Sequence, residues 1–475
     1  MQFYSVIFLF LLIVSVVIYY LIPTRYRNLT LLIYNYLFYI TFDYRLAFLL
    51  FGLTSLNFII GNKLNASEDD KIKYYYVVTA LIINIAALWF FKYFNFFIES
   101  ANGFMNFLGV SVNLSTLNIL LPIGISYYIF QTLTYVLDHY YGTVKGKYNF
   151  LEYAAFASFF PTIVSGPIER ASTLLPQIKL ERNFLSSNIE EGFSLITIGM
   201  FRKLIIADAC GVLVDHVFAE PKYFLSAEVL IAIFLYSFQL YNDFAGYSSI
   251  ARGIAKLFGF DIIINFKQPY FADSITDFWR RWHISLSFWI RDYLFFPLQF
   301  KFRSWGKWGN ILAVMIVFIT IGIWHNPSWS FVFWGFLQGF YISFSILTAN
   351  ARTAFVKKIG LSGRLLAASK ILITFSLTVF AFFVERVDSL HDVIQMLSIV
   401  INWTSSALTY KFLLIFLAVL STTLMIDLLE IKYKSKAFLT KFYPQVKYAV
   451  SIVVWFIIIL FMLTADKLPF IYAQF

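Results

Sequence analysis

Residues 3–22 read FYSVIFLFLLIVSVVIYYLI, an apolar run without a single charge. A helix of about 20 apolar residues is long enough to cross a hydrocarbon core of roughly 30 Å. No basic segment precedes the run and no small-residue cleavage site follows it, which predicts a retained membrane helix and not a secretory signal. Arg25 and Arg27 follow directly. Since basic residues tend to stay in the cytoplasm, we expect the N-terminus on the outer side.

The rest of the chain has the same character. Of its 475 residues 60% are hydrophobic and only 13% charged, and the mean hydropathy is +0.74. A soluble globular protein carries roughly a quarter charged residues. The surface must therefore face lipid, which excludes a soluble enzyme, a nucleic-acid-binding domain and a disordered scaffold. The net charge of +11 fits basic residues in short cytoplasmic loops.

Apolar segments follow one another almost without pause. At about 35–40 residues for each span and its loop, they predict roughly 11–13 crossings, with some segments too short to cross alone. Backbone groups in lipid must pair within their own segment, so the expected fold is an all-α polytopic membrane protein. The segments lie near residues 29–41, 46–60, 75–98, 117–140, 151–166, 192–218, 227–245, 280–300, 309–324, 329–348, 366–384, 411–428 and 447–464.

Several kinds of chemistry have no motif in this chain. The sequence contains no GxxxxGK[ST] phosphate loop, no HExxH zinc pair and no GxSxG elbow. Its one cysteine, Cys210, excludes an internal disulfide and a thiolate metal cluster. We therefore expect no metal site.

The segment DFWRRWHISLSFWIRDY, residues 277–293, is unusual for a lipid boundary. As one continuous helix it would gather its Trp residues on one face and a polar stripe on another. It could be an amphipathic helix lying at the interface, or it could line a polar cavity with arginines available for an anionic donor. The predicted stripe consists of Arg280, His283, Ser287 and Arg291, with Asp277 and Arg281 paired four residues apart.

A second unusual segment is GIWHNPSWSFVFWG, residues 322–335. His325 is the only readily titratable group between Lys307 and Arg352, and ionisable groups at membrane depth are functional candidates by default. Asn326 and Pro327 should end the preceding helix, because the residue before proline avoids the helical conformation. A histidine at such a break is suited to act as a general base. A plain hairpin turn at the far interface is equally compatible with the spacing.

Both segments resemble the membrane-bound O-acyltransferase superfamily. The strings FWRRWHISLSFWIRDYLFFPL (278–298), IGIWHNPSWSFVFWGFLQG (321–339) and YNDFAGYSSIARGIAKLFGF (241–260) carry the resemblance. They are most similar to the bacterial branch that acts on alginate and teichoic acid. The resemblance implies one membrane domain over 1–475, whose helices arch around a funnel or tunnel. N-terminal helices would occupy 1–110, the family core 117–348 and C-terminal helices 366–475.

The resemblance also implies a function and a set of site residues. The expected enzyme passes an acyl group, most simply acetyl, from a cytoplasmic thioester to an envelope polysaccharide or to a partner extracytoplasmic acetyltransferase of the SGNH type. The donor would be acetyl-coenzyme A or an acyl carrier protein, with no tightly bound cofactor, in a bacterial cytoplasmic membrane. His325 would be the catalytic histidine and His283 a second one. The residues expected to contact substrate or line the tunnel are Asn242, Asp243, Arg280, Arg281, Trp282, Ser287, Arg291, Trp324, Asn326 and Gln338.

One departure and two alternatives accompany this assignment. Gln338 stands where alginate-type relatives often carry another histidine, and glutamine cannot shuttle a proton near neutral pH. A transporter or flippase of an envelope glycan intermediate is the first alternative, although the two halves of the chain do not echo each other as inverted repeats would. The second alternative is a catalytically idle scaffold that recruits a partner acetyltransferase.

Overall fold

The computed structural model describes residues 3–110, 114–387, 389–403, 410–464, 468 and 471, and all regular structure in them is helical. Three shorter apolar helices, Val6–Leu21, Phe150–Ile163 and Leu390–Ile401, fit the expectation that some segments are too short to cross alone. Within the residues that the structure describes, eight helices are long and apolar enough to span a membrane, fewer than the roughly 11–13 crossings predicted. They are Tyr44–Ala66, Asp70–Phe107, Ser226–Leu257, Arg303–His325, Trp329–Leu347, Gly363–Arg386, Tyr410–Tyr433 and Pro444–Thr464.

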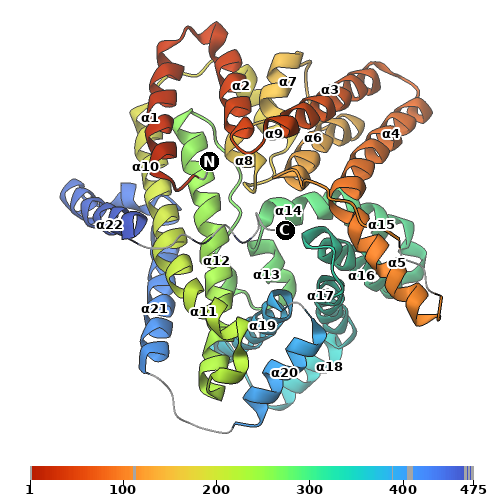
Figure 1. Ribbon diagram of the computed structural model, residues 1–475, viewed down its shortest axis with the longest axis vertical. Coiled ribbons are helices and arrows are strands. Elements are labelled where there is room, and N and C mark those ends of the chain that lie inside the picture. The colour runs from red at the N-terminus through yellow and green to blue at the C-terminus, as the bar shows by residue number, and fades with distance from the viewer. Residues whose placement is uncertain are drawn as a thin grey trace. The chain divides into compact units, whose positions relative to one another are not determined.

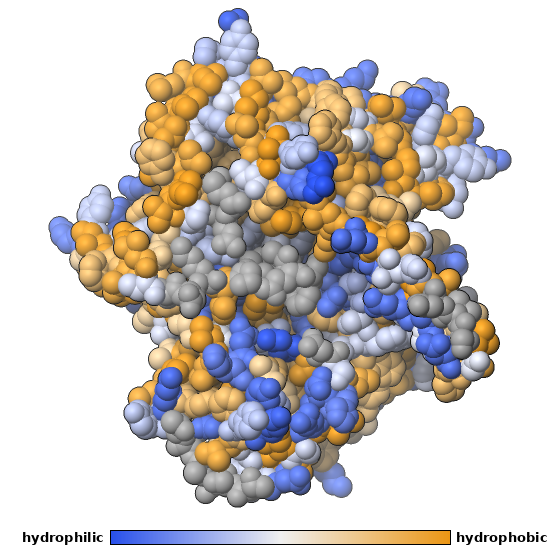
Figure 2. Space-filling view, in the orientation of Figure 1, coloured by the Kyte–Doolittle hydropathy of each residue, from blue (hydrophilic) through white to orange (hydrophobic). Residues whose placement is uncertain are grey.

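The surface of these helices is apolar where a soluble protein would be polar. On α1 (Val6–Leu21), Ile7 and Phe10 are each exposed by more than 60%. Figure 2 shows this hydrophobic covering along α1. On α22 (Pro444–Thr464), Ile452 and Phe456 are as exposed. Such a surface is stable only against hydrocarbon, and the protein is therefore a polytopic integral membrane protein.

The chain divides into two compact units, with boundaries inside α10 (Ser186–Met200), inside α12 (Ser226–Leu257) and between residues 263 and 264. The first unit comprises residues 1–196 and 250–263. Its other helices are α1, α2 (Thr24–Ile40), α3 (Tyr44–Ala66), α4 (Asp70–Leu88), α5 (Phe94–Phe107), α6 (Ile125–Tyr140), α7 (Phe150–Ala157), α8 (Phe160–Ile163) and α9 (Ala171–Lys179).

Buried amides tie the helices of the first unit together. Asn57 on α3 and Asn84 on α4 exchange hydrogen bonds of 3.2 and 2.9 Å. Asn35 on α2 donates to the Ala155 carbonyl and accepts from the Phe160 amide, at 3.1 and 3.0 Å. Helices in lipid gain little from apolar contact alone, so such polar pairs specify which helices meet.

The second unit, residues 197–249 and 264–475, contains every residue of the candidate site. Besides parts of α10 and α12 and four short 3-10 helices, it contains α11 (Ala209–Ala219), α13 (Ile275–Arg281), α14 (Ile284–Ile290), α15 (Phe296–Lys301), α16 (Gly306–His325), α17 (Trp329–Leu347), α18 (Ala349–Lys358), α19 (Gly363–Arg386), α20 (Leu390–Ile401), α21 (Tyr410–Tyr433) and α22. Two π-helices, η2 (Phe201–Asp208) and η5 (Arg291–Phe295), also belong to this unit.

Helices α16 and α17 form a close hairpin, and they run side by side in Figure 1. Glycines permit the close approach: a Cβ on Gly322 would lie 2.2 Å from the Phe331 carbonyl oxygen, and one on Gly335 would lie 2.3 Å from that of Phe318. Helix α16 ends at His325, as the Asn326–Pro327 sequence predicted. Its 20 residues correspond to about 30 Å, the thickness of a hydrocarbon core.

The prediction of one continuous helix over residues 277–293 is wrong. The structure breaks it into α13, α14 and η5, and His283 at the first break has a left-handed backbone with φ 42°. The break is held by another part of the chain: the Ile284 amide donates to the Asn265 carbonyl, and the Ser285 amide donates to Asn265 Oδ1, each at 3.0 Å. Arg281 does pair with Asp277, as predicted, at 2.8 Å.

Candidate active site

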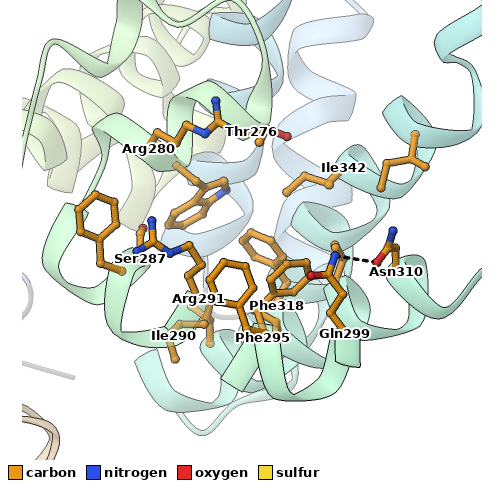
Figure 3. Close-up of a pocket in the computed structure, with 17 residues that line it drawn as sticks. Thr276, Arg280, Ser287, Ile290, Arg291, Phe295, Gln299, Asn310, Phe318 and Ile342 are labelled. Atoms are coloured by element: carbon orange, nitrogen blue, oxygen red, sulfur yellow. Dashed lines mark hydrogen bonds between the residues drawn. The ribbon is translucent and has the colours of Figure 1, made fainter. Parts of the chain in front are cut away.

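A cavity of about 580 Å³ lies between the broken segment and the α16–α17 hairpin. Its walls come from α13, α14, η5, α15, α16 and α17 (Figure 3). Three residues of the predicted polar stripe, Arg280, Ser287 and Arg291, line it, whereas His283 of the same stripe does not. The break at His283 explains the difference, because it turns α14 relative to α13 and ends the helical periodicity.

The polar groups of this cavity are basic or neutral, and its lining includes no acidic side chain. Arg291 forms an ion pair with Asp292 at 2.7 Å, and its side chain is 46% exposed. Arg280 is exposed and forms no ion pair with any described residue. Two guanidinium groups beside a hydroxyl make a site suited to a phosphate or another oxyanion.

Gln299 and Asn310 supply further polar groups that the sequence analysis missed. Gln299 Nε2 donates to Asn310 Oδ1 at 2.9 Å, and Figure 3 shows the pair across the view from Ser287. Their signal in the sequence is weak, since a lone amide in an apolar segment more often faces a neighbouring helix than a ligand.

The remaining wall is apolar and follows α16 toward His325. Asn310 lies near the start of α16 and Ile321 near its end, and both line the cavity. His325 is four residues beyond Ile321, so it lies one turn further on the same face of the helix. The cavity therefore extends along the hairpin toward the histidine.

His325 itself is 5% exposed and lies among aromatic rings. Its ring centroid is 5.4 Å from that of Trp334, which is 6.0 Å from that of Trp279 on the cavity wall. Trp279 Nε1 donates to Gln338 Oε1 at 3.3 Å, which places the predicted Gln338 in the same group. Along this path the indole rings of Trp334 and Trp279 lie between the imidazole and the cavity.

His283 has a different environment. It is 1% exposed, and its ring meets Phe244 edge-on with centroids 4.7 Å apart. The residue lies outside the eight candidate spans, and burial lowers its pKa from 6.5 to about 3. The imidazole is therefore neutral at ordinary pH.

Asn242 and Asp243 lie in a buried network of charged side chains, away from the cavity lining. Asn242 Oδ1 accepts from Arg202 at 2.9 Å, and Asp243 pairs with Lys203 at 2.7 Å. Arg202 and Lys203 are each 1% exposed. Buried charges of this kind are tolerated only when paired.

The other predicted residues lie outside the cavity lining. Trp282 is buried against Phe278 and Phe382, with ring centroids 5.4 and 4.9 Å away. Trp324 packs on His325 at 4.7 Å, and Asn326 is the C-cap of α16. Among the residues that the structure describes, no group of three or more His, Cys, Asp or Glu is arranged to hold a metal ion.

Comparison with known proteins gives a family. Residues 77–384 match the model of MBOAT, the membrane-bound O-acyltransferase family. The chain is 34% identical over 398 residues to the probable alginate O-acetylase AlgI of Pseudomonas syringae, covering 82% of this chain and 73% of the relative. It is 32% identical over 345 residues to the peptidoglycan O-acetyltransferase of Helicobacter pylori, covering 67% and 64%. It is 31% identical over 227 residues to the teichoic acid D-alanyltransferase of Bacillus subtilis, covering 46% and 57%.

Proposed function

Because the chain belongs to the membrane-bound O-acyltransferase family, we propose that it transfers an acetyl group from a thioester donor to a hydroxyl group, with His325 as the base. The observation that carries the proposal is the position of His325 on the face of α16 that lines the cavity, one turn beyond Ile321. A small acyl group in the cavity would then lie next to the aromatic group that contains the imidazole.

The donor we propose is acetyl-coenzyme A or an acylated carrier protein. Both present a thioester at the end of a flexible arm that carries phosphate. Arg280 and Arg291 would bind the phosphate by charge-assisted hydrogen bonds. The apolar wall from Val314 to Ile321 would take the arm and direct the thioester toward His325.

The distribution of charge supports an orientation for this reaction. From residue 293 to residue 384 the sequence contains no Asp or Glu. Lys301, Arg303 and Lys307 precede or begin α16, while Arg352 and Lys357 follow α17 on α18. All lie toward the end of the hairpin away from His325. By the positive-inside tendency this end is cytoplasmic, so the donor enters from the cytoplasm of a bacterial cell.

The chemistry needs one proton acceptor. His325 removes the proton from the acceptor hydroxyl while the oxygen of that hydroxyl attacks the thioester carbonyl carbon. The new C–O bond forms, the C–S bond breaks, and the proton passes to the departing thiolate. Positioned base catalysis of this kind contributes about 10²–10⁴-fold. Trp279 and Gln338 would help to place the acyl group, and the neutral His283 supports the broken segment that forms the opposite wall.

The acceptor class follows from the relatives. The proteins compared above are named for alginate, peptidoglycan and teichoic acid, which are all envelope polymers. We propose that this chain acetylates such a polymer, or passes the acetyl group to an extracytoplasmic acetyltransferase of the SGNH type that completes the transfer.

The decisive experiment replaces His325 with alanine and measures ester-linked acetate on envelope polymers at matched protein abundance. We expect acetate to fall to the level of a strain without the gene, because base catalysis is lost. His391→Ala is the matched control, since His391 is exposed on α20. Normal acetate in the His325→Ala strain would contradict the proposal and favour an idle scaffold or a transporter.

A second experiment concerns donor binding. In isolated membranes, Arg280→Ala and Arg291→Ala should each raise the KM for the thioester donor roughly tenfold, as expected for losing a hydrogen bond to a charged group. The exposed Arg45, which pairs with Asp43 in the first unit, supplies the control Arg45→Ala. An unchanged KM in both cavity variants would remove the arginines from the donor site.

A further inference from the structure

Two residues with strained backbones lie on adjoining segments of the second unit. Gln268 has φ 43° and His283 has φ 42°, a conformation that costs energy for residues other than glycine. The two segments are joined by backbone bonds: Lys267 N donates to the Arg281 carbonyl, and Ile284 N donates to the Asn265 carbonyl, each at 3.0 Å. The segment 265–268 therefore forms the support on which the broken helix rests.

The side chain of Gln268 connects this support to a buried group of charges. Its Nε2 donates to Glu430 Oε2 at 2.7 Å. Glu430 also pairs with Arg202 at 3.3 Å and contacts Lys436, while Arg202 pairs with Asp427 at 2.6 Å. These two cations and two carboxylates, here called the charge cluster, balance one another.

The charge cluster is a rigid anchor. The side chains of Arg202, Asp427 and Glu430 are each exposed by no more than 2%. It joins η2 to α21 and to the chain just after α21, which are elements far apart in sequence. Moving one member would leave a buried charge without its partner, which is strongly unfavourable. Its geometry is therefore fixed.

We propose that Gln268 is a positioning residue of the active site, held by Glu430 so that the break at His283 places Arg280 and Ser287 on the cavity wall. The inference depends on the proposed acyl transfer for its effect on activity, but not for its effect on structure. A left-handed glutamine persists only where the surroundings fix it. The bond to Glu430 supplies that constraint, and the support at 265–268 transmits it to α13 and α14.

The test uses a reporter in the cavity. The chain has a single cysteine, Cys210, which is buried, so Ser287→Cys introduces one reactive thiol on the cavity wall. Its rate of labelling by a small maleimide reports how α14 is held. Into this background we would place Gln268→Glu, Glu430→Gln and the two together. Gln268→Glu places a second carboxylate beside that of Glu430. The double exchange, Gln268→Glu with Glu430→Gln, keeps the net charge and restores the hydrogen bond, with residue 430 now the donor and residue 268 the acceptor.

We expect Gln268→Glu to raise the labelling rate roughly fivefold or more, and the double exchange to return most of that change. Without the reporter, the same variants should raise the donor KM more than they lower kcat, because the arginine wall moves and His325 does not. Gln395→Glu on α20, at an exposed position, is the matched control. A purely structural role would instead lower the amount of folded protein and leave the KM of the remainder unchanged.

A further variant covers the case in which Gln268→Glu does not fold. Gln268→Gly removes the bond to Glu430 but adopts the left-handed backbone without strain. We expect the reporter to label faster in this variant as well. A wild-type labelling rate in a folded Gln268→Gly or Gln268→Glu protein would overturn the proposal. Labelling requires no turnover, so it decides this inference even if the His325→Ala experiment contradicts the proposed function.

Discussion

The helix breaks at the two candidate histidines, His283 and His325, are built in different ways. Helix α16 ends at His325 because Asn326 precedes a proline, and Ser328, three residues after His325, is the N-cap of α17. Helix α13 ends at Arg281 although neither glycine nor proline occurs in residues 277–293. There the chain turns because Asn265, 18 residues before His283, accepts hydrogen bonds from the amide groups of Ile284 and Ser285 that the break exposes.

The difference shows what each end can contribute to a site. A break that is fixed locally leaves its histidine at the end of a rigid helix, behind the indole rings of Trp334 and Trp279. A break that is fixed from a distance can be adjusted by whatever holds it. In this protein that is the support at 265–268 and the charge cluster behind it. The following predictions test this comparison, beginning with the largest expected effect.

The local break requires the close packing of its hairpin. Gly322→Leu would place a side chain against the Phe331 carbonyl, which lies 2.2 Å from the position of a Cβ. We expect a loss of about 3 kcal/mol in the free energy of unfolding, measured in detergent, because the helices must separate. Gly103→Ala on α5 is the control, since no atom lies within 4 Å of its Cβ position, and alanine there should be neutral or stabilising. Equal stability of the two variants would contradict the packing argument.

The distant break depends on one amide. Asn265→Ala removes the acceptor of the buried Ser285 amide at 3.0 Å, and an unsatisfied buried donor costs about 2 kcal/mol. Unfolding of the purified variant measures the loss. Asn402→Ala, at an exposed position after α20, should cost almost nothing. If the two variants unfold alike, the break at His283 is not held by Asn265.

The buried imidazole of His283 predicts a dependence on pH. The pKa of His283 in the folded protein, about 3, is below the ordinary value of 6.5. As the pH falls, the imidazole is therefore protonated in the unfolded chain before it is protonated in the folded protein. The contribution of the neutral imidazole to the free energy of unfolding is fully present above pH 6.5, and it is lost as the pH decreases toward 3. His283→Asn keeps a residue that tolerates the left-handed backbone but removes this proton. Between pH 7 and 5 the wild type should lose more stability than the variant, by up to about 1.4 kcal/mol per pH unit.

Parallel unfolding curves of the two proteins over that range would contradict the burial of the ring. His391→Asn, at an exposed position, should behave as the wild type does.

The smallest effects concern the helix starts. Ser274 and Ser328 are N-caps of α13 and α17, and each accepts a hydrogen bond from the amide three residues later, at 3.3 and 3.4 Å. Alanine at either position should cost about 1 kcal/mol in the free energy of unfolding. Equal losses would show that each serine stabilises only the start of its own helix. The two breaks would then differ only in the distant support that Asn265 gives to the break at His283. A much larger loss at Ser274 would mean that this cap also supports the break.

Much of the architecture could be predicted from residue patterns. The apolar runs predicted an all-helical membrane protein, because hydrophobic length decides whether a segment can cross, but they overestimated the number of long spans, which is eight among the described residues. The Asn326–Pro327 pair gave the end of α16, and the spacing of Asp277 and Arg281 gave an ion pair that the structure contains. Arg280, Ser287 and Arg291 line the cavity, although the continuous helix used to group them does not exist. Their assignment to substrate stays a prediction, as do the catalytic roles of His325 and His283.

Other features could not be predicted, because they join residues that are far apart. Gln299 and Asn310 meet only through the turn between α15 and α16. The pairing of Arg202 with Asp427 joins positions 225 residues apart, and no local pattern marks either residue. The same holds for Asn242 and Asp243, which the resemblance placed along a tunnel and which the structure places among buried charges.

The sequence by itself determined that this chain is an integral membrane protein, that it is a membrane-bound O-acyltransferase, and that a histidine lies at the end of a helix. These are consequences of composition, of short motifs and of proline, all of which act within a few residues. Only the tertiary structure decided where the second helix breaks, which side chains of the broken segment face the cavity, and which charges neutralise one another inside it. Hydrogen bonds between distant residues decided these features, because a buried polar group must find its partner wherever the fold provides one.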